Sequence, residues 1–327
     1  GQPVAEGADE LYSQFKFLDP WIIGHDTWTA FRAEFCEVGF FNEIKGYKNL
    51  DELRRRIDGH CYRVLSRDCQ DLPPRIYKKW KFDLTPGERR IFEELESQDL
   101  AFFKDSESAK LATGHTQEAV LMEKEGEATG ETCSETLEEH RALIKNMRLQ
   151  QISSGWWPGE EFKAIEEGDK LPGRAQALMA LLQQSSGKCL IFARFRADLD
   201  LLQKLLGKEA VSFHGGIKDD DRDEAKRRFM RDPKVKFFLG QPRSAGVGHT
   251  LTAAENVIFY SNDHSLRLRE ECEKRAHRTG LKTKLFVWDL IASDTQDEKI
   301  VRSLREKKRL ADVILKDPES FFLNYEK

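Results

Sequence analysis

Short apolar runs alternate with amphipathic stretches through the second half of the chain. The runs cover residues 189–193, 211–213, 235–239, 257–260 and 285–288. Between and after them, apolar residues recur at helical spacing in residues 197–206, 219–230, 265–278 and 295–315. Buried strands that alternate with helices predict an α/β fold, in which helices cover both faces of a parallel sheet.

The first half of the chain has mainly helical patterning. Helices are predicted in four stretches, which cover residues 10–18, 50–57, 87–100 and 140–152. Residues 75–84 instead alternate apolar side chains with charged ones, as a half-buried strand does. We therefore expect a mostly helical region before the sheet.

Charge is distributed unevenly along the 327 residues, whose net charge is −4. Residues 118–139 contain eight Glu and a single Lys, a composition that predicts an acidic insertion or flexible loop. Like charges repel, so this segment is not expected to bind a nucleic acid. The small net charge excludes nothing, because a local basic stripe is sufficient to bind phosphates.

Several classes of protein are disfavoured by what the sequence contains. The six cysteines form no Cys-Xaa-Xaa-Cys pair, and His277 has no second ligand at useful spacing, so no metal site is predicted. No apolar run approaches the roughly 18 residues of a membrane span, and no membrane partner is expected. The start at Gly1-Gln2-Pro3, without Met, leads us to expect a piece of a longer protein.

Glycine and basic side chains follow the predicted strands directly. In parallel sheets, ligands collect at the carboxyl ends of strands. Arg194 follows the first run, and His214 follows the second. The loop after the third run contains Gly246 and Gly248, whose backbone N–H groups could approach an anion closely. Such a loop can also be a simple turn, but on one edge these groups would form a track for a nucleic-acid backbone.

Two arginines stand three residues apart near the end of a predicted helix. Arg275 and Arg278 would share one helical face. Two guanidinium groups on one face could reach a transferring phosphate. A solvated basic patch is the alternative interpretation.

Taken in order, these segments resemble motifs of the Swi/Snf branch of superfamily two helicases. Residues 188–195 are similar to the fourth motif and residues 246–254, Gly-Val-Gly-His-Thr-Leu-Thr-Ala-Ala, to the fifth. Residues 271–281 resemble the sixth motif and keep its Arg, His, Arg and Gly. The chain departs from the family pattern at Thr250, Glu271 and Leu281.

The resemblance extends towards the start of the chain. Residues 1–12 are similar to the third motif, residues 72–86 to the family's linker, and residues 147–152 to the helix that precedes the second lobe. The phosphate-binding loop Gly-Xaa4-Gly-Lys-Ser/Thr and the Asp-Glu-Xaa-His box do not occur in the sequence. In the family both belong to the first RecA-like lobe.

The resemblance implies a RecA-like parallel sheet lobe, the helicase C-terminal domain, preceded by a mostly helical region. The boundaries that it implies are the end of the first lobe with a helical protrusion at 1–84, a helical linker at 85–171, the second lobe at 172–316 and a tail at 317–327. An N-terminal RecA-like lobe of the same protein would be the partner of this chain.

The same resemblance implies an ATP-dependent translocase on duplex DNA. ATP and Mg²⁺ would be held mainly by the N-terminal lobe, so this chain alone is expected to be inactive. Arg275 and Arg278 would act as arginine fingers, and Gly246 and Gly248 would line the same cleft. Backbone phosphates of DNA would be contacted by Arg194, His214, Gln241, Ser244 and Thr250.

Two alternatives remain open from the sequence. The chain could be a non-catalytic nucleic-acid-binding module derived from a helicase lobe, or half of an RNA helicase. Its short insertions suggest a bacterial or phage protein located in the cytoplasm, whereas a eukaryotic source would imply the nucleus.

Overall fold

The computed structural model describes most of the chain, namely residues 4, 6–39, 44–61, 71–97, 134–157, 164–165, 170–245 and 250–315. The chain forms two compact units. Unit 1 comprises residues 1–79, 186–289 and 300–327, and unit 2 comprises residues 80–185 and 290–299. The domain boundaries expected from the sequence stay a prediction.

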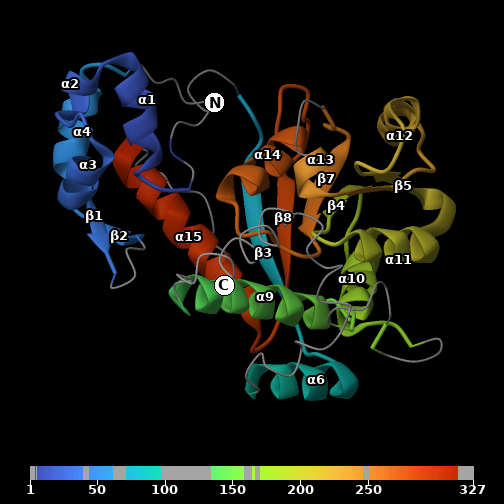
Figure 1. Ribbon diagram of the computed structural model, residues 1–327. Coiled ribbons are helices and arrows are strands. Elements are labelled where there is room, and N and C mark those ends of the chain that lie inside the picture. Colours follow the sequence, from blue (N-terminus) through green and yellow to red (C-terminus); the bar gives the residue numbers. More distant parts are fainter. Residues whose placement is uncertain are drawn as a thin grey trace. The chain divides into compact units, whose positions relative to one another are not determined.

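One six-stranded sheet contains every apolar run that the sequence predicts as a strand (Figure 1). Its strands are β3 (Arg75–Phe82), β4 (Lys188–Phe192), β5 (Ala210–Phe213), β6 (Phe237–Gly240), β7 (Ala254–Phe259) and β8 (Leu285–Ala292). Their order is β3-β8-β7-β4-β6-β5. The pairs β4–β6, β4–β7, β5–β6 and β7–β8 are all parallel, so the predicted α/β fold with a parallel sheet is confirmed.

The register of the sheet brings the ends of its central strands together. Phe192 of β4 pairs with Gly240 of β6 and with Phe259 of β7. Phe213 of β5 pairs with the same Gly240. The loops that follow these strands therefore start at one edge of the sheet, where ligands of parallel sheets bind.

Five helices lie between or after strands β4 to β8 in the sequence. They are α11 (Arg196–Leu206), α12 (Asp219–Arg231), α13 (Pro242–Ala245), α14 (Leu266–Ala276) and α15 (Gln296–Leu315), with a 3₁₀ turn at Gly207–Glu209. Helices α11 and α12 contact β5 and β6, and α14 contacts β7. Leu190, Phe238 and Val257 are fully buried in the resulting core. Burial of such side chains is the main force that holds the helices to the sheet.

The N-terminal helices of unit 1 have their own apolar core. They are α1 (Glu10–Leu18), α2 (Pro20–Ile23), α3 (Trp28–Phe35) and α4 (Leu50–Asp58), with a hairpin of β1 (Cys36–Val38) and β2 (Ile44–Tyr47). Asp19 ends α1 and caps α2, since its side chain accepts a hydrogen bond from the Trp21 N–H. Phe31, Phe35 and Ala311 of α15 are fully buried together in this core.

Unit 2 contains α6 (Pro86–Ser97), α9 (Ser134–Ser153) and α10 (Gly173–Gln184). Phe92 and Leu95 of α6 pack with Leu149 and Ile152 of α9. Most of the acidic segment predicted at 118–139 lies outside the described residues. None of the described helices is long and apolar enough to cross a membrane.

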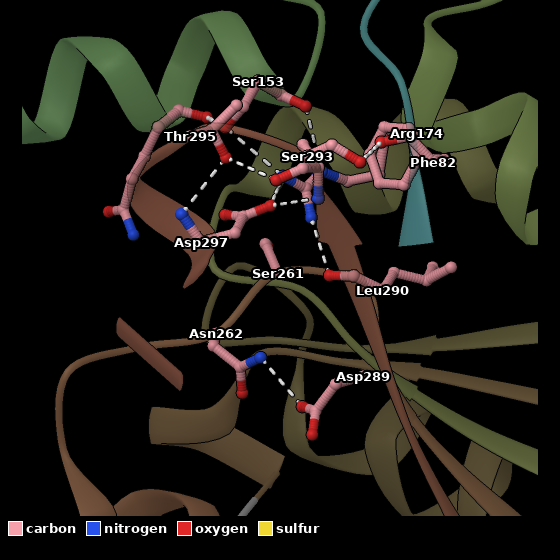
Figure 2. A network of polar contacts seen from close by, with 12 residues as sticks. Phe82, Ser153, Arg174, Ser261, Asn262, Asp289, Leu290, Ser293, Thr295 and Asp297 are labelled. Carbon is pink, nitrogen blue, oxygen red and sulfur yellow. Dashed lines mark hydrogen bonds and ion pairs between the residues drawn. The ribbon is translucent and has the colours of Figure 1, made fainter. Parts of the chain in front are cut away.

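A buried arginine joins the segments of unit 2, as Figure 2 shows. Arg174 of α10 is 1% exposed, and its guanidinium donates to Asp297 Oδ2 over 2.5 Å. It also donates to the Ser153 carbonyl over 3.1 Å and to the Leu290 carbonyl over 3.3 Å. Two segments distant in sequence, the end of α9 at Ser153 and residues 290–297, are thereby bonded to one side chain of α10.

Candidate nucleotide and nucleic-acid interface

Arg194 joins three of the loops at the carboxyl edge of the sheet. Its backbone N–H donates to Ser261 Oγ over 2.8 Å, and its carbonyl accepts from Gln241 Nε2 over 3.2 Å. The backbone N–H of Ser244 in turn donates to the Gln241 carbonyl over 3.1 Å. Arg194, Gln241 and Ser244, which the sequence predicts as phosphate contacts, therefore belong to one hydrogen-bonded group.

The guanidinium of Arg194 is half-buried and lies near charges of both signs, Asp263 and Arg243. Burial lowers the pKa of Arg194; Asp263 opposes this shift and Arg243 adds to it. A partly desolvated guanidinium is stabilised by negative charge, which Asp263 supplies here and which a bound anion would also supply.

His214 directly follows β5, and its ring is buried. Its Nδ1 accepts the Gly216 N–H over 3.2 Å, so a neutral ring has its proton on Nε2. Burial lowers the pKa of His214, and the charges of Arg196 and Arg222 lower it further, whereas the charge of Asp200 opposes the shift. His214 thus has a donor to offer to an acceptor such as a phosphate oxygen, beside two arginines.

The helix with the paired arginines is shorter than predicted. Helix α14 ends at Ala276, because His277 adopts a ψ of 78° outside the helical region. Arg278 therefore lies in the turn beyond the helix, where its N–H donates to the Ala276 carbonyl over 3.0 Å. The prediction that Arg275 and Arg278 share one helical face is wrong.

Arg275 and Arg278 nevertheless meet at the same loop. Arg278 Nη1 donates to Thr250 Oγ1 over 3.1 Å, and the Leu251 N–H donates to the Arg275 carbonyl over 2.8 Å. Burial lowers the pKa of Arg275, and the charge of Arg278 lowers it further, as expected of neighbouring cations. This loop follows Gly246 and Gly248 directly in sequence, and both glycines lie outside the described residues.

Arg278 is exposed at this place. Within the described part of the chain, its polar partner is the Thr250 hydroxyl and no carboxylate pairs with it. A guanidinium without a carboxylate keeps its donors available for an anion. The described residues contain no group of three or more His, Cys, Asp or Glu arranged to hold a metal ion.

A buried charge network under α14 was not predicted from the sequence. Arg269 and Glu273 are 3% and 0% exposed, and Asp289 of β8 is also 0% exposed. Arg269 donates to both carboxylate oxygens of Asp289, over 2.5 and 3.0 Å, and to Glu273 over 3.2 Å. Charged residues make up 34% of the chain, and most charged residues lie on protein surfaces. In the sequence, only the four-residue spacing of Arg269 and Glu273 indicated an ion pair.

The helicase conserved C-terminal domain matches residues 173–280 of the chain. "Helicase SWR1" of Candida albicans is 32% identical over 153 residues, which are 45% of this chain and 9% of that protein. "Helicase ssl-1" of Caenorhabditis elegans is 34% identical over 159 residues, which are 46% of this chain and 7% of that protein. The chain thus spans only about a tenth of the length of these curated relatives.

Solved structures of similar fold include the Sulfolobus solfataricus SWI2/SNF2 ATPase core in complex with dsDNA. That likeness has a TM-score of 0.49 at 21% identity and covers 94% of this chain and 60% of that one. The C-terminal part of the Fun30 ATPase domain has a TM-score of 0.48 at 18% identity and covers 76% of this chain and 98% of that one.

The curated relatives come from fungi and a nematode, so they do not support the bacterial or phage source expected from the sequence. The matched domain and the SWR1 and ssl-1 helicases agree with the family that the motifs indicate. Residues 173–280 therefore match a helicase conserved C-terminal domain, and this part of the chain is similar to the SWR1 and ssl-1 helicases.

Proposed function

We propose that this chain supplies one half of an ATP site in a motor that moves along duplex DNA. An N-terminal RecA-like lobe of the same protein would hold the phosphates and Mg²⁺. Arg275 and Arg278 would face that nucleotide as arginine fingers. The observation that supports this role most is their convergence on Thr250 and Leu251, next to the glycines of the fifth motif.

The chemistry needs positive charge opposite the transferring phosphate. Water attacks the γ-phosphorus, the bond to the bridging oxygen of ADP breaks, and negative charge builds on the oxygens between them. Bound Mg²⁺ would neutralise part of that charge. Arg278, exposed and without a carboxylate partner in the described residues, would stabilise the rest. An arginine finger of this kind accelerates turnover by roughly 10³- to 10⁵-fold.

The DNA would lie along the carboxyl edge of the sheet. Arg194, Gln241 and Ser244 form one hydrogen-bonded group there, and His214 directly follows β5. Thr250 would contact DNA beside the arginines, so nucleotide and DNA would share a loop. Contacts to phosphates suit a motor, because the backbone is the same for every sequence. The eukaryotic relatives favour a nuclear location.

The test compares ATP turnover by the complete protein and by this chain alone. We expect duplex DNA to stimulate the complete protein and the chain alone to be inactive. Arg278→Ala should lower turnover about 10³-fold. Arg267→Ala is the matched control, because Arg267 is on the same helix with a 69% exposed side chain.

Undiminished turnover of Arg278→Ala, or clear ATP hydrolysis by the chain alone, would overturn the proposal. Stimulation by RNA and not by duplex DNA would favour the RNA helicase. DNA binding by a complete protein without ATP turnover would favour the binding module.

A further inference from the structure

Helix α14 is held by a stripe of buried polar side chains one turn apart. Arg269 and Glu273 form an i, i+4 ion pair, with side chains 2% and 0% exposed. Beyond the bonds to Asp289, the guanidinium of Arg269 donates to Asn262 Oδ1 over 2.6 Å. It also lies 4.1 Å from the centre of the Phe259 ring. The start of the helix is thus fixed to β7, to its following loop and to β8.

Strand β3 and the residues before it form hydrogen bonds with the other end of the same stripe. Glu273 Oε2 accepts hydrogen bonds from Tyr77 Oη over 2.7 Å and from Arg75 Nη1 over 2.8 Å. One helical turn later, His277 Nε2 lies 2.8 Å from the Pro73 carbonyl and donates to it. The segment from Pro73 to Tyr77 therefore contacts α14 where Arg275 stands.

The rotation of α14 about its axis decides where Arg275 points. Glu273 and Arg275 are two residues apart, which is about 200° around a helix. When Glu273 faces the sheet, Arg275 must face the opposite side. A slip of one residue would turn Arg275 by about 100°. Arg275 has its own local supports, since its Nε donates to the Glu271 carbonyl over 2.9 Å and its carbonyl accepts the Leu251 N–H.

We propose that Tyr77 and Arg75, acting through Glu273, are positioning residues that hold Arg275 in its orientation towards the nucleotide. The proposal rests on the function proposed above. Glu273 is fully buried and accepts from three side chains, so no other rotation of the helix satisfies its carboxylate. Strand β3 thereby sets the geometry of the arginine helix as well as extending the sheet.

The test measures ATP turnover by the complete protein with Tyr77→Phe and with Glu273→Gln. Misplacing a reacting group by about 1 Å can cost 10²-fold, so we expect kcat to fall about 10- to 100-fold. KM for ATP should stay within about twofold, because the N-terminal lobe would hold the nucleotide. Asp297→Asn is the matched control, since it breaks the buried pair with Arg174 in unit 2. The control should lower the unfolding temperature and leave kcat unchanged.

Amide hydrogen exchange provides a readout that does not depend on ATP turnover. The Leu251 N–H donates to the Arg275 carbonyl, and the His277 N–H donates to the Glu273 carbonyl over 2.9 Å. Exchange at these two amides therefore measures how often each hydrogen bond opens. Tyr77→Phe should speed exchange at both amides, and Asp297→Asn should leave both unchanged.

The outcomes separate the two proposals. If Arg275→Ala keeps full turnover but Tyr77→Phe speeds exchange, Arg275 is not an arginine finger, but Tyr77 still holds α14 in position. If Arg275→Ala is inactive while Tyr77→Phe has normal kcat and normal exchange, the positioning role is overturned. Should Glu273→Gln fail to fold, Tyr77→Phe alone decides, because it removes one hydroxyl and keeps the ring.

Discussion

Neighbouring residues at the end of α14 have separate environments. His277 donates to the Pro73 carbonyl on the buried side, whereas Arg278 is exposed and donates to Thr250. The structure brings Arg275 and Arg278 to Thr250 and Leu251 of the fifth motif, and their role at a nucleotide stays a prediction. The sequence could not predict that the helix ends before Arg278, because a single ψ angle at His277 ends it.

Protonation of His277 should weaken the folded state. Burial lowers the pKa of His277, the charge of Arg75 lowers it further, and the bond to Pro73 partly opposes the shift. The unfolded chain, with an ordinary pKa near 6.5, then binds a proton more readily than the folded one. The contribution of His277 to stability is therefore fully present above about pH 6.5 and is lost as pH falls through the lowered folded value.

The measurement is the free energy of unfolding of wild type and His277→Gln by urea between pH 5 and pH 8. We expect the advantage of the wild type to shrink on acidification. An advantage that grows as pH falls would contradict this account of His277.

At the scale of elements, apolar runs predicted the strands well. Five runs became β4 to β8, because a parallel sheet covered by helices buries nearly every side chain of its strands. The pairing of β3 with β8 was not predicted, since it joins residues some 200 positions apart by backbone hydrogen bonds such as Leu285 N–H to Pro74 O. The hairpin of β1 and β2 was also missed, because strands of three and four residues containing Glu37 and Lys45 show no apolar run.

Buried charge is the other feature that patterning did not predict. Arg174→Ala leaves Asp297 buried without its ion-pair partner. We therefore expect the free energy of unfolding to fall by about 3–5 kcal/mol. Lys81→Ala is the matched control, because its pair with Glu298 is exposed, with 58% of the Lys81 side chain accessible, and should contribute about 0–1 kcal/mol.

Urea unfolding of the whole chain checks this prediction. Equal effects of the two substitutions would show that Arg174 does not hold unit 2 together.

At the scale of the whole molecule, six ordered motifs indicated the family, and the helicase conserved C-terminal domain at residues 173–280 agrees. The two compact units divide the chain differently from the boundaries expected from the sequence. Strands β3 and β8 and helix α15 each contribute residues to both units. Patterning along the chain cannot show this, because membership of a unit depends on long-range contacts. The inference of a bacterial or phage source from short insertions found no support, since loop length is only weakly tied to lineage.

The binding of a transition-state analogue tests whether Arg275 and Arg278 act as arginine fingers. An arginine finger binds the transferring phosphate more tightly in the transition state than in the ground state. For the complete protein, Arg275→Ala and Arg278→Ala should weaken binding of ADP with aluminium fluoride by about 10²-fold or more and leave ADP binding unchanged. Arg267→Ala should change neither affinity. Undiminished affinity of both variants for the analogue would contradict the assignment of Arg275 and Arg278 to the nucleotide.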